Sequence, residues 1–332
     1  MRLRPTQLAA ALAAGLLTWI VSTGIAFPPP KSTGGGIEAE SATATDASAT
    51  STPIVMPSAT PPPTITGLHQ APPLTQAAIE PVEAATATPL PLFRPTPDAG
   101  VAQRGLVLPI LTYHYVEPWP NEASPLRQGL TVRPEDFAAQ MQFLVDEGYT
   151  TISLYALIDS LATGTPLPER PVVLTFDDGY AGLFEYAAPV LQRGDQTATV
   201  FVITEFVDQE RPEYLSWSDL RFLNRLGWSV EPHTKTHIGL DGLRYERQLY
   251  EMLGSIETIE ANLGVRPRFF NYPSGSYDET TLALAPELGL WGGVTTAGGW
   301  YHRYADRYTL TRIRVTGHTD LAHFAEILDY GR

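Results

Sequence analysis

The sequence contains no cysteine. Disulfide bonds and thiolate ligands are therefore excluded, so stability must come from an ordinary core and any metal ion must be held by His, Asp or Glu. Basic residues are also scarce, with 22 Lys and Arg against 36 Asp and Glu and a net charge of −14. This acidity disfavours nucleic acids and anionic polymers as partners. It is compatible with neutral or cationic glycans.

Aromatic residues are nearly missing from residues 28–104, where Phe93 is the single example in a stretch rich in Pro, Thr, Ala and Ser. Such a composition cannot bury enough apolar surface to offset the entropy lost on ordering. We predict a disordered linker here, partly polyproline-like, that holds the following domain away from a membrane.

Residues 1–27 begin Met-Arg-Leu-Arg and continue as a largely apolar run from Leu8 to Phe27. A basic flank before an apolar run is typical of a signal peptide or an N-terminal transmembrane anchor. The length of the run favours an anchor, whereas the small residues around Ala26 keep cleavage open. In both cases the rest of the chain is exported, and we expect an extracytoplasmic protein that is either membrane-anchored or secreted.

Residues 105–332 have the hydrophobic density of a globular protein and suffice for one large domain, which we expect to be monomeric. Short β-rich segments alternate with helix-length periodic segments, a pattern that favours an α/β fold built as a distorted barrel of seven or eight βα units. The expected strands are 106–112, 150–153, 172–176, 197–203, 228–231, 269–271, 293–296 and 313–315. The clearest helix ends before Gly264, and another begins at Ser216, where Asp219 completes a capping box.

An adjacent pair of carboxylates, Asp177 and Asp178, follows the apolar strand expected over 172–176. In βα barrels the reactive face lies at the carboxyl ends of the strands, so catalytic carboxylates are expected there. Taken alone, the pair is also compatible with a turn in which the two acids cap the next helix.

Histidines stand at two other predicted strand ends. His233 and His237 are four residues apart and would lie on one face if the segment were helical, close enough to bind one divalent cation. His114 follows the first predicted strand and would stand on the same rim. One carboxylate and two imidazoles give a cation three protein ligands and leave a position open, which is typical of a hydrolytic site.

These motifs resemble those of the polysaccharide deacetylase family, also called the NodB homology domain or carbohydrate esterase family 4. The Thr-Phe-Asp-Asp-Gly sequence at 175–179 and the His-Thr-x-x-His sequence at 233–237 both match that family completely. The sequences Tyr-His-Tyr at 113–115, Pro-Ser-Gly at 273–275 and Thr-Arg-Ile-Arg-Val at 311–315 are similar to the branch that acts on poly-N-acetylglucosamine and related exported glycans.

The resemblance implies a metal-dependent hydrolase that removes N-acetyl groups from an N-acetylglucosamine-containing polysaccharide. It implies that Asp178, His233 and His237 bind the metal and that Asp177 is the general base. The cation would be Zn²⁺ by the nature of these ligands, with Ni²⁺, Co²⁺ or Mn²⁺ as alternatives. His114 would be the general acid. The backbone N–H of Ser274 is the candidate oxyanion donor, and the neighbouring residues assigned to substrate or oxyanion binding are Tyr272, Pro273 and Asn271.

Three features depart from the family pattern. Asn271 stands where many members have an Arg that orients the catalytic Asp, so Asp177 is expected to be tuned differently. The Leu-x-His sequence that supplies the acid elsewhere is missing, and His318 does not fit it. Glu231 and Pro232 replace the usual small residues before the first metal histidine. An O-acetyl esterase acting on xylan or a cell-envelope glycan, and a non-catalytic glycan-binding module, therefore stay as alternative functions.

Overall fold

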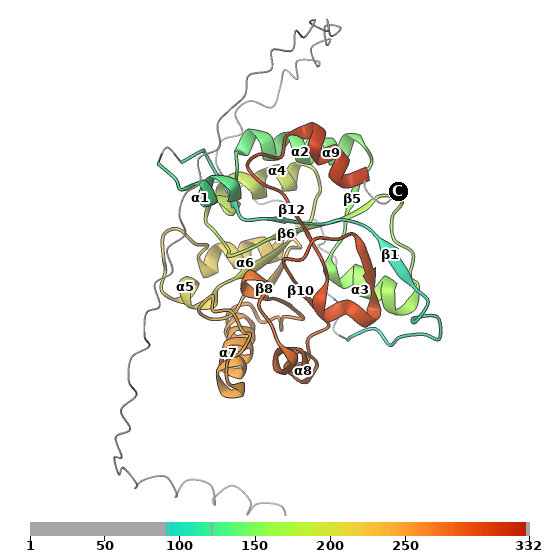
Figure 1. Cartoon of the computed structure of the whole chain (residues 1–332). Coiled ribbons are helices and arrows are strands. Elements are labelled where there is room, and N and C mark those ends of the chain that lie inside the picture. Colours follow the sequence, from blue (N-terminus) through green and yellow to red (C-terminus); the bar gives the residue numbers. More distant parts are fainter. Residues whose placement is uncertain (1–90, 92, 121, 330–332) are drawn as a thin grey trace, which may run out of the picture. The chain divides into compact units, whose positions relative to one another are not determined.

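The structure is a computed structural model that describes residues 91, 93–120 and 122–329 (Figure 1). The predicted signal or anchor and most of the predicted linker lie outside these residues. At the edge of the predicted linker, Asp98 N–H donates to Ala162 O at 3.0 Å and Arg104 donates to Leu161 O at 2.9 Å. The contacts of the folded domain therefore begin a few residues before Gly105. Within the described residues no helix is both long and apolar enough to cross a bilayer.

The fold is α/β with a mostly parallel sheet, as the sequence predicts. A parallel sheet joins β2 (Ile110–Tyr113), β6 (Pro171–Phe176), β7 (Thr199–Val202), β8 (Ser229–Pro232) and β12 (Ile313–Arg314) in the order β12-β2-β6-β7-β8. A second parallel pair is formed by β9 (Phe269–Asn271) and β10 (Gly292–Val294). A bridge between Val294 and Leu310 connects β10 to the segment that leads into β12.

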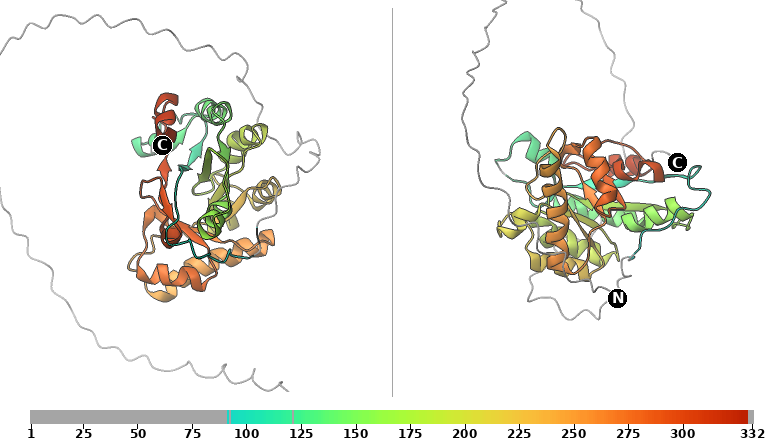
Figure 2. Two further views of the ribbon diagram at one scale, coloured as in Figure 1. Left: turned by 90° about the vertical axis from the view of Figure 1, so that its right-hand side faces the viewer. Right: turned by 90° about the horizontal axis from the view of Figure 1, so that it is seen from below.

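Helices surround these strands, as the two views of Figure 2 show. In Figure 1, α2 (Pro134–Asp146), α4 (Ala188–Arg193) and α9 (Leu321–Asp329) lie above the sheet, whereas α7 (Tyr245–Leu263) and α8 (Glu279–Glu287) lie below it. The remaining α-helices are α1 (Pro125–Leu130), α3 (Leu154–Thr163), α5 (Thr204–Asp208) and α6 (Trp217–Arg225). The short turns are a π-helix, η1 (Leu183–Ala187), and two 3-10 helices, η2 (Pro273–Gly275) and η3 (Tyr304–Thr309).

Both helix-end predictions are confirmed. The Ser216 side chain accepts the Asp219 N–H at 3.2 Å, while the Asp219 carboxylate accepts the Ser216 N–H at 2.9 Å. Helix α7 ends at Gly264, which has a φ of 71°. Only glycine adopts this left-handed conformation without steric cost, so its position fixes the end of the helix.

Two strand predictions need correction. The segment expected as one strand over 106–112 is divided, because Pro109 has no N–H to donate. Its first part, β1 (Gly105–Val107), pairs antiparallel with β11 (Tyr301–Arg303), and only the second part, β2, enters the parallel sheet. The strand expected over 150–153 is the short β5 (Thr150–Thr151), which pairs with the start of β6 beside the main path of the sheet. The other short pair is β3 (Tyr115–Val116) with β4 (Thr131–Val132).

Glu231 fills the gap between β8 and β9, which are not paired by backbone hydrogen bonds among the described residues. Its carboxylate is 1% exposed. One oxygen accepts the backbone N–H groups of Arg268 and Phe269, each at 2.8 Å, and the other accepts the Tyr155 hydroxyl at 2.9 Å. A side chain thus satisfies donors at the start of β9 that a neighbouring strand would otherwise bind. This explains the unusual glutamate two residues before His233.

We call this side-chain link between β8 and β9 the seam at Glu231. It makes the stability of the domain depend on pH. Burial raises the pKa of this carboxyl to about 7, although the hydrogen bonds from Phe269 and Tyr155 favour the ionised form. The folded protein therefore holds the proton more tightly than the unfolded chain, and the resulting stabilisation is complete below about pH 4.5 and lost as the pH rises towards 7. Relative to the Glu231→Gln variant, we expect the wild type to lose roughly 2–3 kcal/mol of unfolding free energy across this range.

Urea denaturation of both proteins at several pH values measures this difference. Glutamine has the same shape and can still accept the two backbone N–H groups, so all other titrations cancel between the two proteins. A difference in unfolding free energy that stays constant with pH would contradict the raised pKa of Glu231.

Candidate active site

Strand alternation gives the two adjacent acids at the end of β6 different surroundings. Leu174 and Phe176 belong to the hydrophobic cluster that includes α2 and α4, whereas Val173 belongs to a second cluster on the opposite face. Because side chains alternate along a strand, Asp177 continues the row of Val173 and Thr175. Alternation alone would direct Asp178 to the face of Leu174 and Phe176, but its φ of 68° lies in the left-handed region and turns it away from the extended strand.

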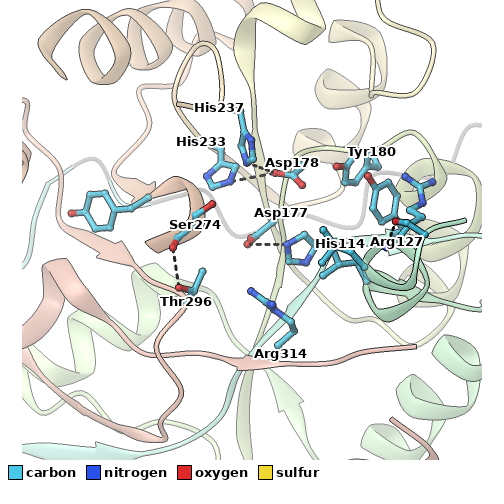
Figure 3. A pocket seen from close by; sticks show the side chains of 15 residues that line it. His114, Arg127, Asp177, Asp178, Tyr180, His233, His237, Ser274, Thr296 and Arg314 are labelled. Atoms are coloured by element: carbon cyan, nitrogen blue, oxygen red, sulfur yellow. Dashed lines mark hydrogen bonds and ion pairs between the residues drawn. The ribbon is translucent and has the colours of Figure 1, made fainter. Parts of the chain in front are cut away.

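Asp178 faces the two histidines of the predicted metal site (Figure 3). Its Oδ1 lies 3.3 Å from His233 Nε2 and 3.2 Å from His237 Nε2. Each of the three residues offers one ligand atom, and these atoms all lie within 4.8 Å of one another. Among the described residues they form the one group of this kind.

The two histidines approach each other without a helix. The chain after β8 runs through bends, and the left-handed backbone of Thr234 (φ 63°) and His237 (φ 64°) folds it back. The ring centroids are 5.0 Å apart. The proximity predicted for a helical segment is therefore produced by a strained loop. His233 also places Nδ1 2.8 Å from Asn271 O, which fixes the ring with Nε2 towards Asp178.

The geometry of this group fits a tetrahedral cation. Ligand bonds of about 2.0–2.1 Å in a tetrahedron place neighbouring ligand atoms about 3.3–3.4 Å apart. The two distances from Asp178 Oδ1, 3.2 and 3.3 Å, agree with this edge length. The same oxygen is buried and accepts no hydrogen bond from the described residues. A buried carboxylate oxygen without a donor indicates that a cation belongs beside it.

Asp177 is bound by an arginine that comes from the other end of the domain. Arg312 donates to both carboxylate oxygens, at 2.7 Å to Oδ1 and 2.8 Å to Oδ2. Its guanidinium is 1% exposed. It also donates to Asn271 Oδ1 at 3.0 Å and to the hydroxyls of Thr112 and Thr175 at 3.0 and 3.1 Å. Bidentate pairs of this kind fix a carboxylate in one orientation.

This network explains the departure at Asn271. An arginine is expected at that position in many members of the family, but here the guanidinium reaches the carboxylate from Arg312, just before β12. Asn271 is fully buried and serves as an acceptor for that guanidinium. It does not line the pocket, and neither does Pro273.

The charge of Arg312 determines the ionisation of Asp177. Burial alone would raise the pKa of Asp177, but the charge of Arg312 and its hydrogen bonds lower it to about 2. His114 lies beside this pair, with Nε2 4.0 Å from Asp177 Oδ2. Burial lowers the pKa of His114, against the opposing effect of the Asp177 and Asp178 carboxylates.

The two acids and the three histidines of the site line one pocket of about 470 Å³, a volume within the range of small-ligand sites. One side of the pocket carries Tyr272, Ser274 and Thr296. Ser274 has a φ of 57°, and its N–H donates to no acceptor among the described residues. The Tyr272 hydroxyl is buried without a partner. Arg314 also lines the pocket, exposed and without an ion pair to any described residue.

The opposite side of the pocket carries Tyr115, Tyr180 and Arg127. Together with Tyr214, which stacks on Tyr180, we call this group the tyrosine wall. The rings of Tyr115 and Tyr180 stack with centroids 3.6 Å apart, and Tyr214 follows at 5.1 Å. The Arg127 guanidinium covers the other face of Tyr115 at 3.1 Å and pairs with Glu117 at 2.5 Å. Beside this wall, α1 contributes Leu126, Leu130 and the preceding Ser124 to the pocket.

Comparison with known proteins agrees with this site. The sequence pattern of the family described as polysaccharide deacetylase matches residues 164–292. YxkH of Bacillus subtilis, which is named for this family, is 32% identical over 209 residues that cover 63% of this chain and 71% of that protein. The chain belongs to the polysaccharide deacetylase family.

Two further deacetylases are similar to this chain. The poly-β-1,6-N-acetyl-D-glucosamine N-deacetylase of Escherichia coli K12 is 31% identical over 257 residues, covering 65% of this chain and 38% of that protein. The deacetylase PplD of Streptococcus pyogenes, solved in complex with acetate, superimposes with a TM-score of 0.63 at 29% identity, covering 68% of this chain and all of that one. The deacetylase fold therefore extends over the described domain.

Sequence reasoning found the acid pair and the histidines but not the residues that surround them. Arg312 was noted only as part of a family-like sequence, and its contact with Asp177 was not foreseen. Arg314 was likewise noted only within that sequence, and Tyr115 only beside His114, whereas Arg127, Tyr180 and Tyr214 were missed. The two arginines of the Arg-Ile-Arg sequence share one face of a strand end, and this spacing is the signal that could have revealed them. His318 is exposed and does not line the pocket.

Proposed function

We propose that this protein is a metal-dependent hydrolase that removes N-acetyl groups from an N-acetylglucosamine-containing polysaccharide. The observation that carries the proposal is the division of labour between adjacent acids: Asp178 faces two histidines, whereas Asp177 is held by Arg312 within the same pocket. A binding module would have no use for an oriented, ionised carboxylate beside a cation site. The activity for which the E. coli relative is named supports the substrate class.

Asp177 acts as the general base in this proposal. With a pKa of about 2 it stays ionised across the physiological range, so it is always able to accept a proton, although it is a weak base. A zinc-class cation on Asp178, His233 and His237 would offset this weakness, because it increases the acidity of water and polarises a carbonyl group. Arg312 keeps both oxygens of Asp177 in a fixed direction, so the carboxylate needs no reorganisation when the proton arrives.

Two further groups complete the proposed chemistry. His114 donates the proton to the leaving amine from its protonated form, which the neighbouring Asp177 and Asp178 carboxylates favour against the burial that lowers its pKa. The Ser274 N–H binds the oxygen of the acyl group as negative charge develops there, since this donor is not used by any described residue. Tyr272 and Arg314 contact the glycan from the floor and edge of the same pocket.

The test is release of acetate from N-acetylglucosamine oligomers by the purified chain, with and without a chelator. We expect release that is lost on chelation and restored by Zn²⁺, because Asp178, His233 and His237 would contribute to the reaction only through the cation that they hold. An O-acetylated xylan assayed beside the amide substrate distinguishes an O-acetyl esterase, for which the ester would be strongly preferred. Absence of metal-dependent acetate release from both substrates would contradict the proposal.

We further propose that the enzyme acts outside the cytoplasm. The basic and apolar start of the chain supports export. The E. coli relative is named for poly-β-1,6-N-acetyl-D-glucosamine, which is a polysaccharide of the class proposed here as the substrate. Fractionation of cells that express the full chain, with N-terminal sequencing of the product, distinguishes a retained anchor from a cleaved signal peptide.

A further inference from the structure

The loop that carries the two histidines contains two non-glycine residues with strained backbone angles. Of its residues, Thr234 and His237 both have a positive φ, 63° and 64°. Non-glycine residues seldom adopt this region, and they persist there only where surrounding contacts determine the conformation. The loop therefore needs specific partners that hold it in shape.

One side of the loop is held through its carbonyl groups. The N–H of Thr204 donates to Thr234 O at 3.3 Å, and the N–H of Glu205 donates to Lys235 O at 3.0 Å. Both donors belong to the first turn of α5, where backbone N–H groups have no partner within the helix. Inside the loop, the Thr234 hydroxyl accepts the His237 N–H at 2.9 Å.

The other side is held by one buried carboxylate, Glu251 of α7. One of its oxygens accepts the backbone N–H groups of Lys235 and Thr236, at 2.9 and 3.0 Å. The other accepts the Thr236 hydroxyl at 2.8 Å and pairs with Arg247 at 2.7 Å. The Glu251 side chain is fully buried, whereas that of Arg247 is 45% exposed. All contacts of Glu251 to the loop fall between the two histidines.

We propose that Glu251 is a positioning residue for the metal site. By fixing the backbone between His233 and His237, it sets the separation and direction of the two imidazoles before any cation arrives. The inference rests on the proposed metal site, but Glu251 touches neither the cation nor the substrate. A preorganised ligand loop binds a cation more tightly than a loop that must first adopt strained backbone angles.

The test measures Co²⁺ affinity of metal-free protein by titration, with the visible absorption of the bound ion as a readout of its coordination. For Glu251→Ala we expect about 10- to 100-fold weaker binding, because four contacts to the loop and Arg247 are lost. Glu251→Gln keeps an acceptor for both backbone N–H groups, so its affinity should recover most of the way to the wild-type value. Glu251→Asp is one methylene shorter and should not recover it.

Two control variants separate positioning from a general loss of stability. Met252→Ala removes a fully buried neighbour on α7 and destabilises the domain without removing any of the hydrogen bonds that hold the loop. Glu260→Gln makes the same chemical change as Glu251→Gln on the same helix, but it breaks an ion pair with Arg266 instead of the contacts to the loop. Both should bind Co²⁺ within a few-fold of the wild type well below their unfolding temperatures, and each unfolding temperature is measured alongside.

The outcomes are distinct. Weak Co²⁺ binding by Glu251→Ala with near-normal binding by Met252→Ala supports the inference. Equal loss in both variants, or unchanged affinity and absorption in Glu251→Ala, overturns it and leaves Glu251 a residue of the general fold. If the wild type itself binds no Co²⁺, the metal site of the proposed function fails, and the inference fails with it.

Discussion

Replacing Asp177 by asparagine is expected to lower the rate of acetate release by about 10²- to 10⁴-fold, the usual contribution of a general base. The amide has nearly the same shape as the carboxylate, but it cannot accept a proton at neutral pH. Asp178 and the two histidines are unchanged, so Co²⁺ and oligosaccharide binding should persist. The measurement is kcat/KM on N-acetylglucosamine oligomers, together with titration of the metal-free variant.

This variant also distinguishes an enzyme from a glycan-binding module. A module that kept the fold without catalysis would show the same absence of acetate release in the wild type and in Asp177→Asn, with equal glycan affinity. A large difference in turnover at equal metal affinity assigns the base to Asp177. Loss of metal binding in the variant would instead place Asp177 among the ligands.

Replacing Arg312 by methionine is expected to affect both stability and catalysis. The change leaves Asp177 buried without its partner, and breaking a buried ion pair in this way costs about 3–5 kcal/mol. The pKa of Asp177 should rise, because burial would no longer be opposed by a cation. Activity should therefore fall, and its decline at acid pH should move to higher pH than in the wild type.

A double variant provides the matched control. Asp177→Asn combined with Arg312→Met removes both charges, so it should regain much of the stability lost in Arg312→Met without regaining activity. Arg312→Lys keeps the charge but cannot form two parallel hydrogen bonds, so a shallower loss of activity is expected. Urea denaturation and a pH–rate profile measure both effects. An unshifted acid limb in Arg312→Met would contradict the assigned role of Arg312.

Much of the site follows from local sequence, because its main elements are encoded within a few residues. Asp177 and Asp178 end an apolar strand, and His233 and His237 end another, so both pairs are assigned to the same rim of a parallel fold. The fold class follows from the alternation of strand and helix patterns. The capping box at Ser216 and the glycine that ends α7 are equally local, and both are confirmed.

The interactions that tune the site are not local. Arg312 lies 135 residues after Asp177, so no short motif relates the two. The family pattern places the orienting arginine at position 271, so it does not point to Arg312. Glu251 lies on α7, 15 and 16 residues after the loop residues whose N–H groups it accepts, and in the sequence it looks like any glutamate on the surface of a helix. Side-chain partners of this kind depend on how the chain packs, which periodicity does not encode.

The seam at Glu231 was missed for a related reason. A glutamate near the end of a buried strand looks like an anomaly because charged groups are costly in a core. Its purpose becomes clear only when the unpaired N–H groups of Arg268 and Phe269 are seen beside it. The left-handed backbone at Thr234 and His237 likewise could not be predicted from the sequence, since neither residue is a glycine.

For the proposed glycan substrate, the tyrosine wall limits how a sugar chain can be recognised at this side of the pocket. The Arg127 guanidinium and the rings of Tyr180 and Tyr214 cover both faces of the inner rings. These stacking contacts leave little flat aromatic surface on Tyr115 or Tyr180 for a pyranose ring to lie against, so these two residues offer mainly ring edges and phenolic hydroxyls. We therefore expect recognition of the proposed substrate on this side to depend on the directions of its sugar hydroxyls, so that epimers are distinguished by hydrogen bonding rather than held by a shared hydrophobic surface.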